Sequence, residues 1–337
     1  MIHYIIVSIL VAISTFLIQY GLTHIRLLPA QASVQAETVD WLFGIHIWLI
    51  SFLFSLIVVF LLYSLIVFRK RKGDESDGPY ITGNSKLEMI WTAGPLAIVL
   101  IVAFLGAQSL ADIERRDPDA LRVNVIASQW VWRFEYPGYN ITSPDLVLPV
   151  DKQVVLLLQS TDVIHSFWVP EFRVKQDALP GGKNFIRELR VTPNEIGTYK
   201  VRCAELCGTQ HYAMVADVRV VDQDEFDAWV AEAQLGCDLE ASQCGERWAT
   251  NYGCFSCHSI DGSELVGPTW LGLYQSTVTL QDGSTVQADE DYLRESIINP
   301  NAMIPEGFPA GVMPQNFGDQ IPEEQINEII EFIKSLQ

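Results

Sequence analysis

The longest charge-free run in the chain does most to limit its fold. Residues 41–68 (WLFGIHIWLISFLFSLIVVFLLYSLIVF) contain no Asp, Glu, Lys or Arg in 28 positions, and residues 4–20 and 89–110 form two further charge-free runs. A membrane-spanning helix needs roughly 20 predominantly apolar residues. The sequence therefore predicts a helical transmembrane anchor over residues 1–110, with helices at about 4–20, 41–68 and 89–110.

The first run has a second interpretation. It is long enough for the apolar core of a secretory signal, and Ala30-Gln31-Ala32 provides the small residues of a cleavage site. Such signals begin with basic residues, however, and no Lys or Arg precedes this run. We therefore expect a retained first helix, while cleavage stays open.

The charge pattern predicts the orientation of the anchor. The four basic residues Arg69–Lys72 directly follow the second run, which puts that loop in the cytoplasm by the positive-inside rule. The third helix then delivers everything after residue 110 to the outer side. The formal net charge of −19 fits that side, away from the anionic cytoplasmic leaflet. We predict a multi-pass protein of a bacterial plasma membrane whose soluble part faces the periplasmic or extracytoplasmic space.

The pattern changes after residue 110 to short β-rich segments separated by Pro, Gly or Asn, and then to helical periodicity from about residue 240. The first pattern predicts an antiparallel sandwich or barrel over residues 111–235, and the second a small helical domain over residues 236–337. The expected strands are 121–128, 131–136, 154–160, 185–191, 198–204 and 215–221, and the expected helices lie in ERWATNYGC, DEDYLRESIIN and PEEQINEIIEFIKSL.

The helical part contains Cys254-Phe-Ser-Cys257-His258. C-x-x-C-H is the signature of covalent c-type haem attachment, in which two thiols bond the haem and the adjacent imidazole binds its iron. A redox or zinc C-x-x-C is the alternative. A thioether is the expected sixth ligand in an electron-transfer haem. Met313, next to Pro314 in a loop, is favoured over Met303, which follows a predicted helix and has a packing role as its alternative.

A second cluster of metal-capable side chains lies in CAELCGTQHYAM, which contains Cys203, Cys207, His211 and Met214. Thiolate, imidazole and weak thioether ligands together favour copper in electron-transfer sites. Two cysteines four residues apart can bridge two coppers, each of which then needs one terminal imidazole. His165 is the remaining candidate for the second imidazole, because His258 belongs to the haem motif.

Three other interpretations of this cluster remain. The two cysteines and two histidines form a chemically possible zinc site, although Met214 would then have no role. A disulfide between Cys203 and Cys207 would leave both histidines without a role. A thioredoxin-like copper chaperone would need a βαβ pattern, which this region lacks.

These motifs resemble subunit II of haem–copper cytochrome c oxidases, specifically the caa type with a cytochrome c fused at the C-terminus. The resemblance covers essentially the whole chain, through LEMIWTAGPLAIVL, QWVWRFEYP, DVIHSFWVPEF and CAELCGTQHYAM. It implies a multidomain fold: a transmembrane helical anchor, an all-β cupredoxin-like Greek-key barrel and a small all-α class I cytochrome c domain. The ligands that it implies for a dinuclear copper A centre are His165, Cys203, the carbonyl of Glu205, Cys207, His211 and Met214.

The resemblance implies further roles. The Glu205 side chain would bind magnesium at the boundary with subunit I. Trp130 matches the family's electron-entry aromatic residue, and a core position is the alternative for one of the pair Trp130 and Trp132. Glu88 matches the carboxylate at the mouth of a proton channel into subunit I, and a simple interaction with the helix dipole is its alternative.

Two cysteines between the predicted domains remain. Cys237 and Cys244 lie seven apart on the oxidising side of the membrane, so we predict that they form a disulfide that stiffens the linker. Residues 240–337 hold 15 Asp and Glu against 3 Lys and Arg. This charge would steer a basic donor protein, or would simply keep the outer surface solvated.

The sequence thus predicts the electron-entry subunit of a proton-pumping terminal oxidase, a cytochrome-c oxidase whose oxygen chemistry lies in subunit I. The expected partners are subunit I, subunit III, the membrane and an external donor, which is a cytochrome c, a small copper protein or a donor complex; no nucleic acid is expected. The alternative is the copper A and haem c subunit of a nitric oxide reductase. A quinol oxidase subunit II would lack the copper ligands that are present here.

Overall fold

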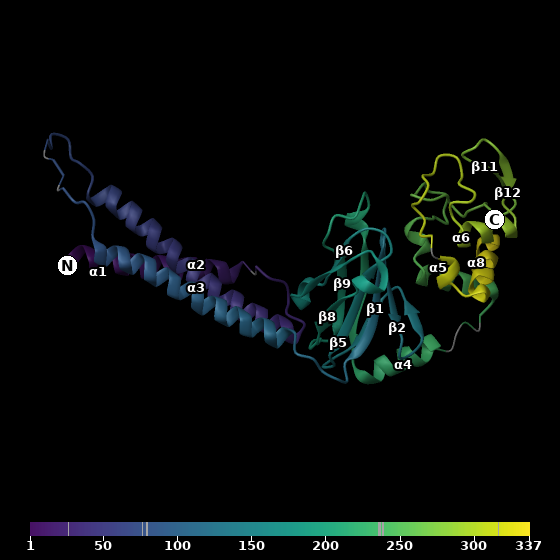
Figure 1. Cartoon of the computed structure of the whole chain (residues 1–337), viewed down its shortest axis with the longest axis horizontal. Helices are drawn as coiled ribbons and strands as arrows, with labels where there is room; N and C mark the ends of the chain where they lie inside the picture. Colours follow the sequence, from purple (N-terminus) through teal and green to yellow (C-terminus); the bar gives the residue numbers. More distant parts are fainter. Residues whose placement is uncertain (26, 76, 79, 235–236, 238, 316) are drawn as a thin grey trace. The chain divides into compact units, whose positions relative to one another are not determined.

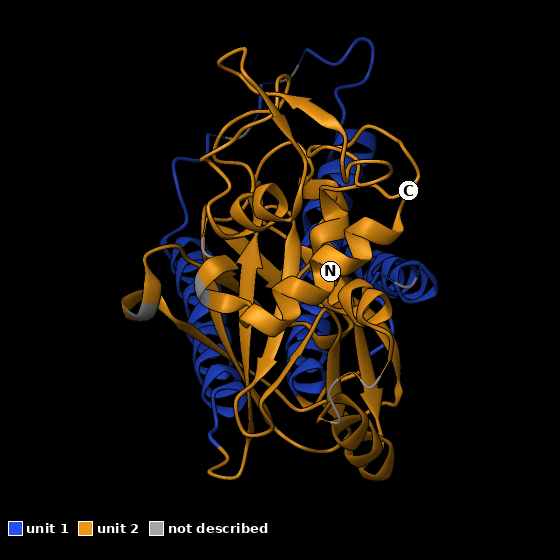
Figure 2. Ribbon diagram, turned by 90° about the vertical axis from the view of Figure 1, so that its right-hand side faces the viewer, with its two compact units in different colours: residues 1–31, 35–116 blue, residues 32–34, 117–337 orange. Residues whose placement is uncertain are grey.

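The computed structural model describes residues 1–337 except 26, 76, 79, 235, 236, 238 and 316 (Figure 1). It divides into two compact units. The first comprises residues 1–31 and 35–116, and the second comprises residues 32–34 and 117–337 (Figure 2). The predicted boundary between residues 235 and 236 lies outside the described residues, so the division of the second unit at that point stays a prediction.

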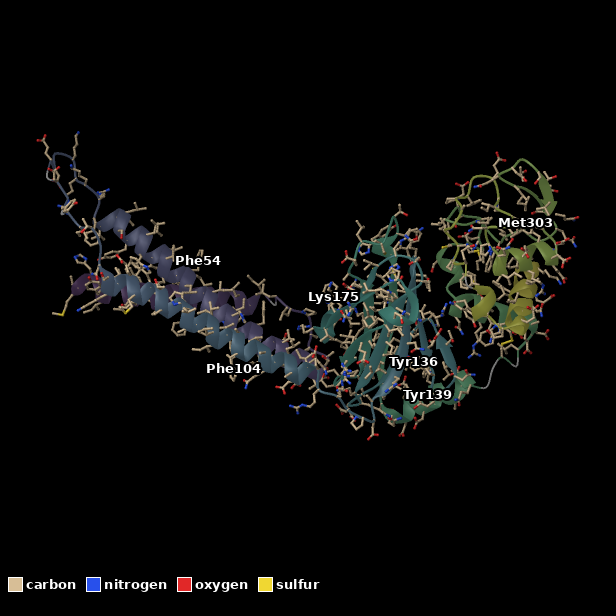
Figure 3. All side chains as sticks on the ribbon, in the orientation of Figure 1. Phe54, Phe104, Tyr136, Tyr139, Lys175 and Met303 are labelled. Atoms are coloured by element: carbon tan, nitrogen blue, oxygen red, sulfur yellow. A yellow bond between two sulfur atoms is a disulfide. The ribbon has the colours of Figure 1, made fainter. Side chains whose placement is uncertain are left out.

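The first unit contains three long apolar helices, α1 (Ile2–His24), α2 (Val34–Val67) and α3 (Ser85–Ile113). All three are long and apolar enough to cross a membrane, as the charge-free runs predict, and each extends a few residues beyond its run except at the end of α2. Large apolar side chains cover their outer surfaces. Phe54 of α2 and Phe104 of α3 project outward and are more than half exposed (Figure 3). This surface suits a hydrocarbon environment.

Helix α1 packs antiparallel against α2 through small polar residues. Ser55 Oγ donates a hydrogen bond to Ser14 Oγ at 3.1 Å, and Ser51 Oγ donates to Gln19 Oε1 at 3.4 Å. Small hydroxyl residues allow close helix approach and form hydrogen bonds between helices in an apolar medium. The first charge-free run is therefore a packed helix of the anchor in this structure.

The β part of the second unit is a sandwich of two five-stranded sheets. One sheet has the order β3-β2-β1-β5-β8 and the other β4-β10-β9-β6-β7. The expected antiparallel arrangement is wrong in two places, because β1 pairs with β5 and β4 pairs with β10 in parallel. The strands are β1 (Leu121–Ser128), β2 (Val131–Tyr136), β3 (Ile141–Ser143), β4 (Leu146–Pro149), β5 (Val154–Ser160), β6 (His165–Trp168), β7 (Lys175–Ala178), β8 (Arg187–Val191), β9 (Gly197–Cys203) and β10 (Val215–Val221).

Alternating apolar residues produce this sandwich. In β5 every second side chain is buried, including Leu156 and Leu158, so one face of the strand enters the core. Trp132, Phe134 and Phe167 fill the space between the sheets and are at most 1% exposed. The short 3₁₀ helices η1 (Pro170–Phe172), η2 (Gly182–Phe185) and η3 (His211–Ala213) lie in the connections.

Helix α4 (Gln223–Gln234) follows the last strand and packs against the sandwich. Its Trp229 contacts Tyr136 with ring centroids 4.9 Å apart, and Phe226 contacts Tyr139 at 5.9 Å. The sequence patterns did not predict this helix. Both tyrosines are labelled in Figure 3, beside α4.

The helical part of the second unit contains α5 (Ala241–Asn251), η4 (Cys254–Ser256), α6 (Glu290–Ile298), α7 (Phe317–Gln320) and α8 (Glu323–Ser335). Helices α5 and α8 cross at Gly245, where an added Cβ would lie only 1.9 Å from the carbonyl oxygen of Glu328. A two-stranded hairpin, β11 (Thr277–Thr279) and β12 (Thr285–Gln287), lies between η4 and α6, where the sequence patterns predicted no strand. Cys237 and Cys244 form a disulfide with Cα atoms 5.6 Å apart.

Candidate functional site

Two free thiols lie side by side at the end of strand β9. Cys203 is the last residue of β9, and the loop that follows returns Cys207 to it, so that the two Sγ atoms are 3.6 Å apart. Both residues are buried, at 9% and 3% exposure. They form no disulfide. This spacing suits two sulfurs that share metal ions.

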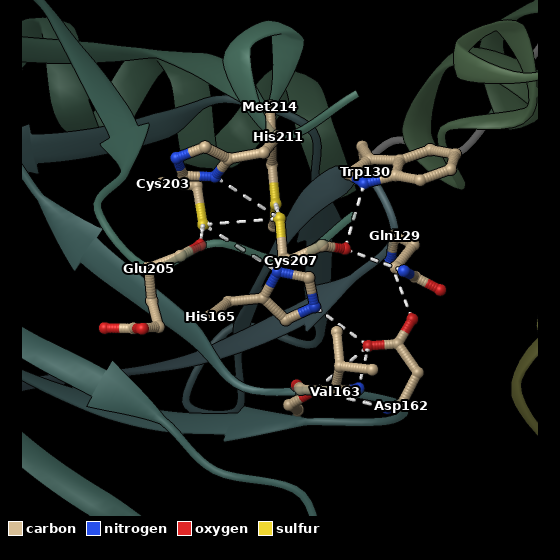
Figure 4. A network of polar contacts seen from close by, with 11 residues as sticks. Gln129, Trp130, Asp162, Val163, His165, Cys203, Glu205, Cys207, His211 and Met214 are labelled. Atoms are coloured by element: carbon tan, nitrogen blue, oxygen red, sulfur yellow. Dashed lines mark hydrogen bonds and ion pairs between the residues drawn. The ribbon is translucent and has the colours of Figure 1, made fainter. Parts of the chain in front are cut away.

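Two histidines direct the same ring nitrogen at these thiols. Nδ1 of His165 lies 3.8 Å from Cys203 Sγ, and Nδ1 of His211 lies 3.5 Å from Cys207 Sγ (Figure 4). His165 is the first residue of β6, and the pairing of β6 with β9 places it beside Cys203. The ligand atoms of His165, Cys203 and Cys207 all lie within 4.8 Å of one another.

Two weaker donors complete the cluster. The thioether sulfur of Met214, which is fully buried, lies 3.9 Å from Cys207 Sγ. The backbone carbonyl oxygen of Glu205 lies 3.2 Å from Cys203 Sγ. Figure 4 shows the Glu205 carboxylate pointing away from the sulfurs. The structure therefore brings all six candidate copper donors together.

The ionisation of the thiols favours cations at this site. Burial raises the pKa of Cys203, but hydrogen bonds with His165 and with backbone groups outweigh this effect and lower it overall. Burial and the adjacent Cys203 sulfur raise the pKa of Cys207. Two thiolates this close ionise together only when positive charge lies between them, which metal ions supply. The donor set of two thiolates, two imidazoles and a thioether fits copper.

The segment between β1 and β2 lies against the loop that follows Cys203 and contains Cys207. Trp130 Nε1 donates to the carbonyl oxygen of Cys207 at 3.2 Å, and Gln129 Nε2 donates to the same oxygen at 2.7 Å. Trp130 lies in the turn and is partly exposed, whereas Trp132 on β2 is 1% exposed and belongs to the core. Both tryptophans therefore lie at the candidate site: Trp130 is the partly exposed one, and the buried Trp132 packs against His165 with ring centroids 6.3 Å apart.

One residue near the copper donors was missed in the sequence. Asp162 lies three residues before His165, and its carboxylate oxygen is 2.8 Å from His165 Nε2. Burial raises the pKa of Asp162, but hydrogen bonds from His165 and from backbone amides outweigh this effect and lower it. The sequence signal was present in the spacing D-x-x-H, but that spacing has no meaning until the loop conformation is known.

The residues of the haem-attachment motif line an apolar cavity. Cys254 lies in η4, Cys257 directly follows it, and both line the cavity with His258. Nδ1 of His258 lies 2.8 Å from the carbonyl oxygen of Pro268, which leaves Nε2 free for iron. Burial lowers the pKa of His258, which favours the neutral imidazole, the form that binds iron.

Space behind this imidazole depends on one glycine. A Cβ at Gly267 would lie 2.8 Å from His258 Cε1, so the loop passes the ring closely only as glycine. Met303 and Met313 both line the same cavity. The thiols, the imidazole and the thioethers fit a covalently attached haem, whereas the choice of Met313 over Met303 stays a prediction.

Glu88 lies in the first unit, at the start of α3. Its Oε1 accepts a hydrogen bond from the backbone N–H of Asn84 at 3.3 Å, while the Asn84 side chain accepts one from Leu87 N at 3.2 Å. This reciprocal arrangement caps the helix, much as a capping box does. A proton-channel role for Glu88 stays a prediction from the resemblance.

Three family models match the chain along its length. The transmembrane domain of cytochrome c oxidase subunit II matches residues 20–110, the periplasmic domain of that subunit matches residues 141–221, and cytochrome c matches residues 243–337. The copper cluster lies in the second match and the haem motif in the third.

Curated relatives extend this likeness over most of the chain. Cytochrome c oxidase subunit 2 of Bacillus sp. strain PS3 is 34% identical over 291 residues, which cover 80% of each chain. The same subunit of Alkalihalophilus pseudofirmus is 30% identical and covers 83% of this chain and 82% of its own. A crystal structure of the periplasmic domain of subunit II from Bradyrhizobium japonicum is 29% identical, with a TM-score of 0.33 over 36% of this chain and 96% of that chain.

The relatives, the copper donors and the haem motif agree with one another. The chain belongs to the cytochrome c oxidase subunit II family, as a membrane-anchored electron-entry subunit that carries a copper A domain on the periplasmic side and a fused cytochrome c domain.

Proposed function

We propose that the six clustered donors hold the dinuclear copper centre of this subunit. Cys203 and Cys207 would hold the two coppers through Sγ, and His165 and His211 would hold them through Nδ1. Met214 and the carbonyl oxygen of Glu205 would be weaker donors to the same centre. The separation of 3.6 Å between the two thiol sulfurs, with imidazoles on opposite sides, is the observation that carries this assignment.

We further propose that Cys254 and Cys257 would attach the haem and that His258 and Met313 would hold its iron. Bound haem and copper supply reversible one-electron chemistry. The protein fixes their ligands on strand ends and short helices, so that the ligands move little when an electron arrives. An external donor would deliver electrons to the haem domain, and subunit I would receive them from the copper domain.

The names of the relatives support oxygen reduction in the partner chain. On this assignment Trp130, hydrogen-bonded to the Cys207 carbonyl, is the residue through which electrons enter the copper centre. A magnesium ion on the Glu205 carboxylate would need further ligands from subunit I, so it is a prediction for the assembled oxidase. We also propose, from the resemblance to the family, that the chain assembles with subunit III, receives electrons from an external donor and uses Glu88 at the entrance of a proton channel.

Metal analysis of the full detergent-solubilised chain tests the assignment. We expect two coppers per haem iron and an electron paramagnetic resonance spectrum whose unpaired electron is shared over two copper nuclei. Cys207→Ser should remove the copper spectrum and leave the haem attached. Cys254→Ser should prevent normal haem attachment and leave the copper spectrum unchanged. One copper, or zinc, in the purified chain would contradict the dinuclear site.

A further inference from the structure

The two histidines that face the thiols have different surroundings. His165 is fully buried, and the carboxylate of Asp162 lies behind it, 2.8 Å from Nε2. His211 is only partly buried. Within the described part of the chain, no carboxylate lies within hydrogen-bond distance of the His211 ring. The imidazole of His165 is thus held on both sides, between a carboxylate and the sulfur of Cys203.

The same carboxylate also holds the segment that carries Trp130. The backbone N–H of Gln129 donates to Asp162 Oδ2 at 2.7 Å. The side chains of Gln129 and Trp130 both donate to the carbonyl oxygen of Cys207. Hydrogen bonds therefore connect His165, Asp162, Gln129 and Cys207 in one network (Figure 4).

Asp162 is itself fixed by its own loop. The backbone N–H of Val163 donates to Oδ1 at 2.6 Å, and Ser160 Oγ donates to Oδ1 at 3.2 Å. The Asp162 side chain is 29% exposed, so water reaches one side of the carboxylate while the other faces the buried ring. A carboxylate held in this way orients the group that it contacts with little loss of entropy on metal binding.

We propose that Asp162 is a positioning residue for the copper centre. It holds His165 in the tautomer that leaves Nδ1 free for copper, and it ties that ligand to the Gln129–Trp130 segment. This proposal rests on the ligand assignment under Proposed function. It goes further in stating that the two copper positions are unequal, because among the residues that the structure describes a carboxylate lies within hydrogen-bond distance of the His165 ring and none of the His211 ring.

Charge predicts the direction of the effect. A carboxylate that accepts the Nε2 proton of His165 makes the imidazole a stronger donor and stabilises the more positive, oxidised copper pair. Its negative charge therefore lowers the reduction potential of the pair. Asp162→Asn retains the shape and the hydrogen-bonding oxygen but removes the charge, so the potential should rise.

The test compares Asp162→Asn with Asp177→Asn in the full detergent-solubilised chain, loaded with copper and haem. Asp177 accepts a hydrogen bond from Ser166 Oγ at 2.8 Å, and Ser166 adjoins His165 on β6, but Asp177 does not contact the ligand ring. We expect Asp162→Asn to change the equilibrium constant for copper reduction by two- to tenfold. A tenfold change corresponds to about 59 mV for a one-electron couple. The hyperfine pattern of the copper spectrum should change with it, and the haem potential should not.

Copper titration provides a second readout. Loss of an orienting carboxylate weakens metal binding by about 10–100-fold, so weaker copper binding in Asp162→Asn but not in Asp177→Asn also supports the proposal. Unchanged potential, spectrum and affinity in Asp162→Asn would overturn it, and so would equal losses in both variants. If the unmodified chain contains no copper pair, the ligand assignment fails instead.

Discussion

The sulfur atoms of Cys203 and Cys207 lie 3.6 Å apart, yet they belong to free thiols. Strand β9 fixes the position of Cys203. The side chains of Gln129 and Trp130 fix Cys207, because both donate hydrogen bonds to the carbonyl oxygen of Cys207. The fold thus brings the thiols together without a covalent bond. The two sulfurs can therefore either bind metal ions or be oxidised to a disulfide.

The metal-free chain should be sensitive to oxidation. We expect molecular oxygen to convert Cys203 and Cys207 into a disulfide once copper is removed by a chelator, since the domain faces an oxidising compartment. Mass spectrometry should show the loss of two hydrogens, and copper should not bind until a thiol reductant is added. Cys207→Ser is the control and should show no such change. Full copper uptake by the oxidised chain without reductant would contradict this prediction.

The sixth haem ligand can be identified by substitution at the two methionines of the cavity. Met313→Leu should remove the far-red methionine-to-iron absorption band and lower the haem potential, because a thioether ligand favours the reduced iron. Met303→Leu, in the same cavity, is the matched control and should keep the band. The opposite pattern would assign the ligand to Met303.

Much of the architecture was predictable from local patterns. Charge-free runs predicted the three anchor helices, and alternating residues predicted β1, β2, β5 and β10 with their observed bounds. These elements carry their own signal because a long apolar run, or a regular alternation, allows few other structures.

Other elements carry too little local signal. Strands β3, β4, β6 and β7 have only three or four residues each, and their neighbours in the sheets define them. The parallel pairing of β1 with β5 is a long-range property of the chain. Helix α4 has only three large apolar residues, Phe226, Trp229 and Val230, and the packing of its two aromatic rings on Tyr136 and Tyr139 stabilises it.

The candidate site divides in the same way. Cysteine, histidine and methionine are distinctive metal ligands, so His165, Cys203 and Met214 were predictable from residue type and spacing. Asp162 and Gln129 are common surface residues. Asp162 reaches His165 through the conformation of its own loop, which the spacing alone does not predict, and Gln129 contacts Asp162 and Cys207 across 33 and 78 positions of the chain.

The crossing of α5 and α8 should tolerate no side chain at Gly245. A Cβ there would lie 1.9 Å from the Glu328 carbonyl oxygen and 2.7 Å from Phe332 Cβ, so the helices would have to separate. We expect Gly245→Ala to destabilise the haem domain by about 3 kcal/mol, the upper part of the usual range for overpacking. Thermal unfolding followed by haem absorbance measures this change. Glu246→Ala, at an exposed position on the same helix, is the control, and equal melting of both variants would contradict the prediction.

The Cys237–Cys244 disulfide shortens the connection between the copper and haem domains. Helix α4 ends at Gln234, and the disulfide ties Cys237 to Cys244 in α5, so only two residues lie between the end of α4 and the tied cysteine. Without the disulfide, the free chain runs from Gln234 to Ala241, the start of α5. An extended chain spans at most about 3.5 Å per residue, so its reach would grow from about 10 Å to about 25 Å.

A longer tether lowers the effective concentration of one domain at the other. Because effective concentration falls roughly as the −3/2 power of tether length, Cys237→Ala/Cys244→Ala should slow electron transfer from haem to copper about threefold. Flash reduction of the haem, followed by the copper absorbance, measures this rate, and unchanged potentials at both centres are the control. If the rate does not change, the contact between the domains would have to be maintained by their own surfaces, and the disulfide would serve only the stability of the haem domain.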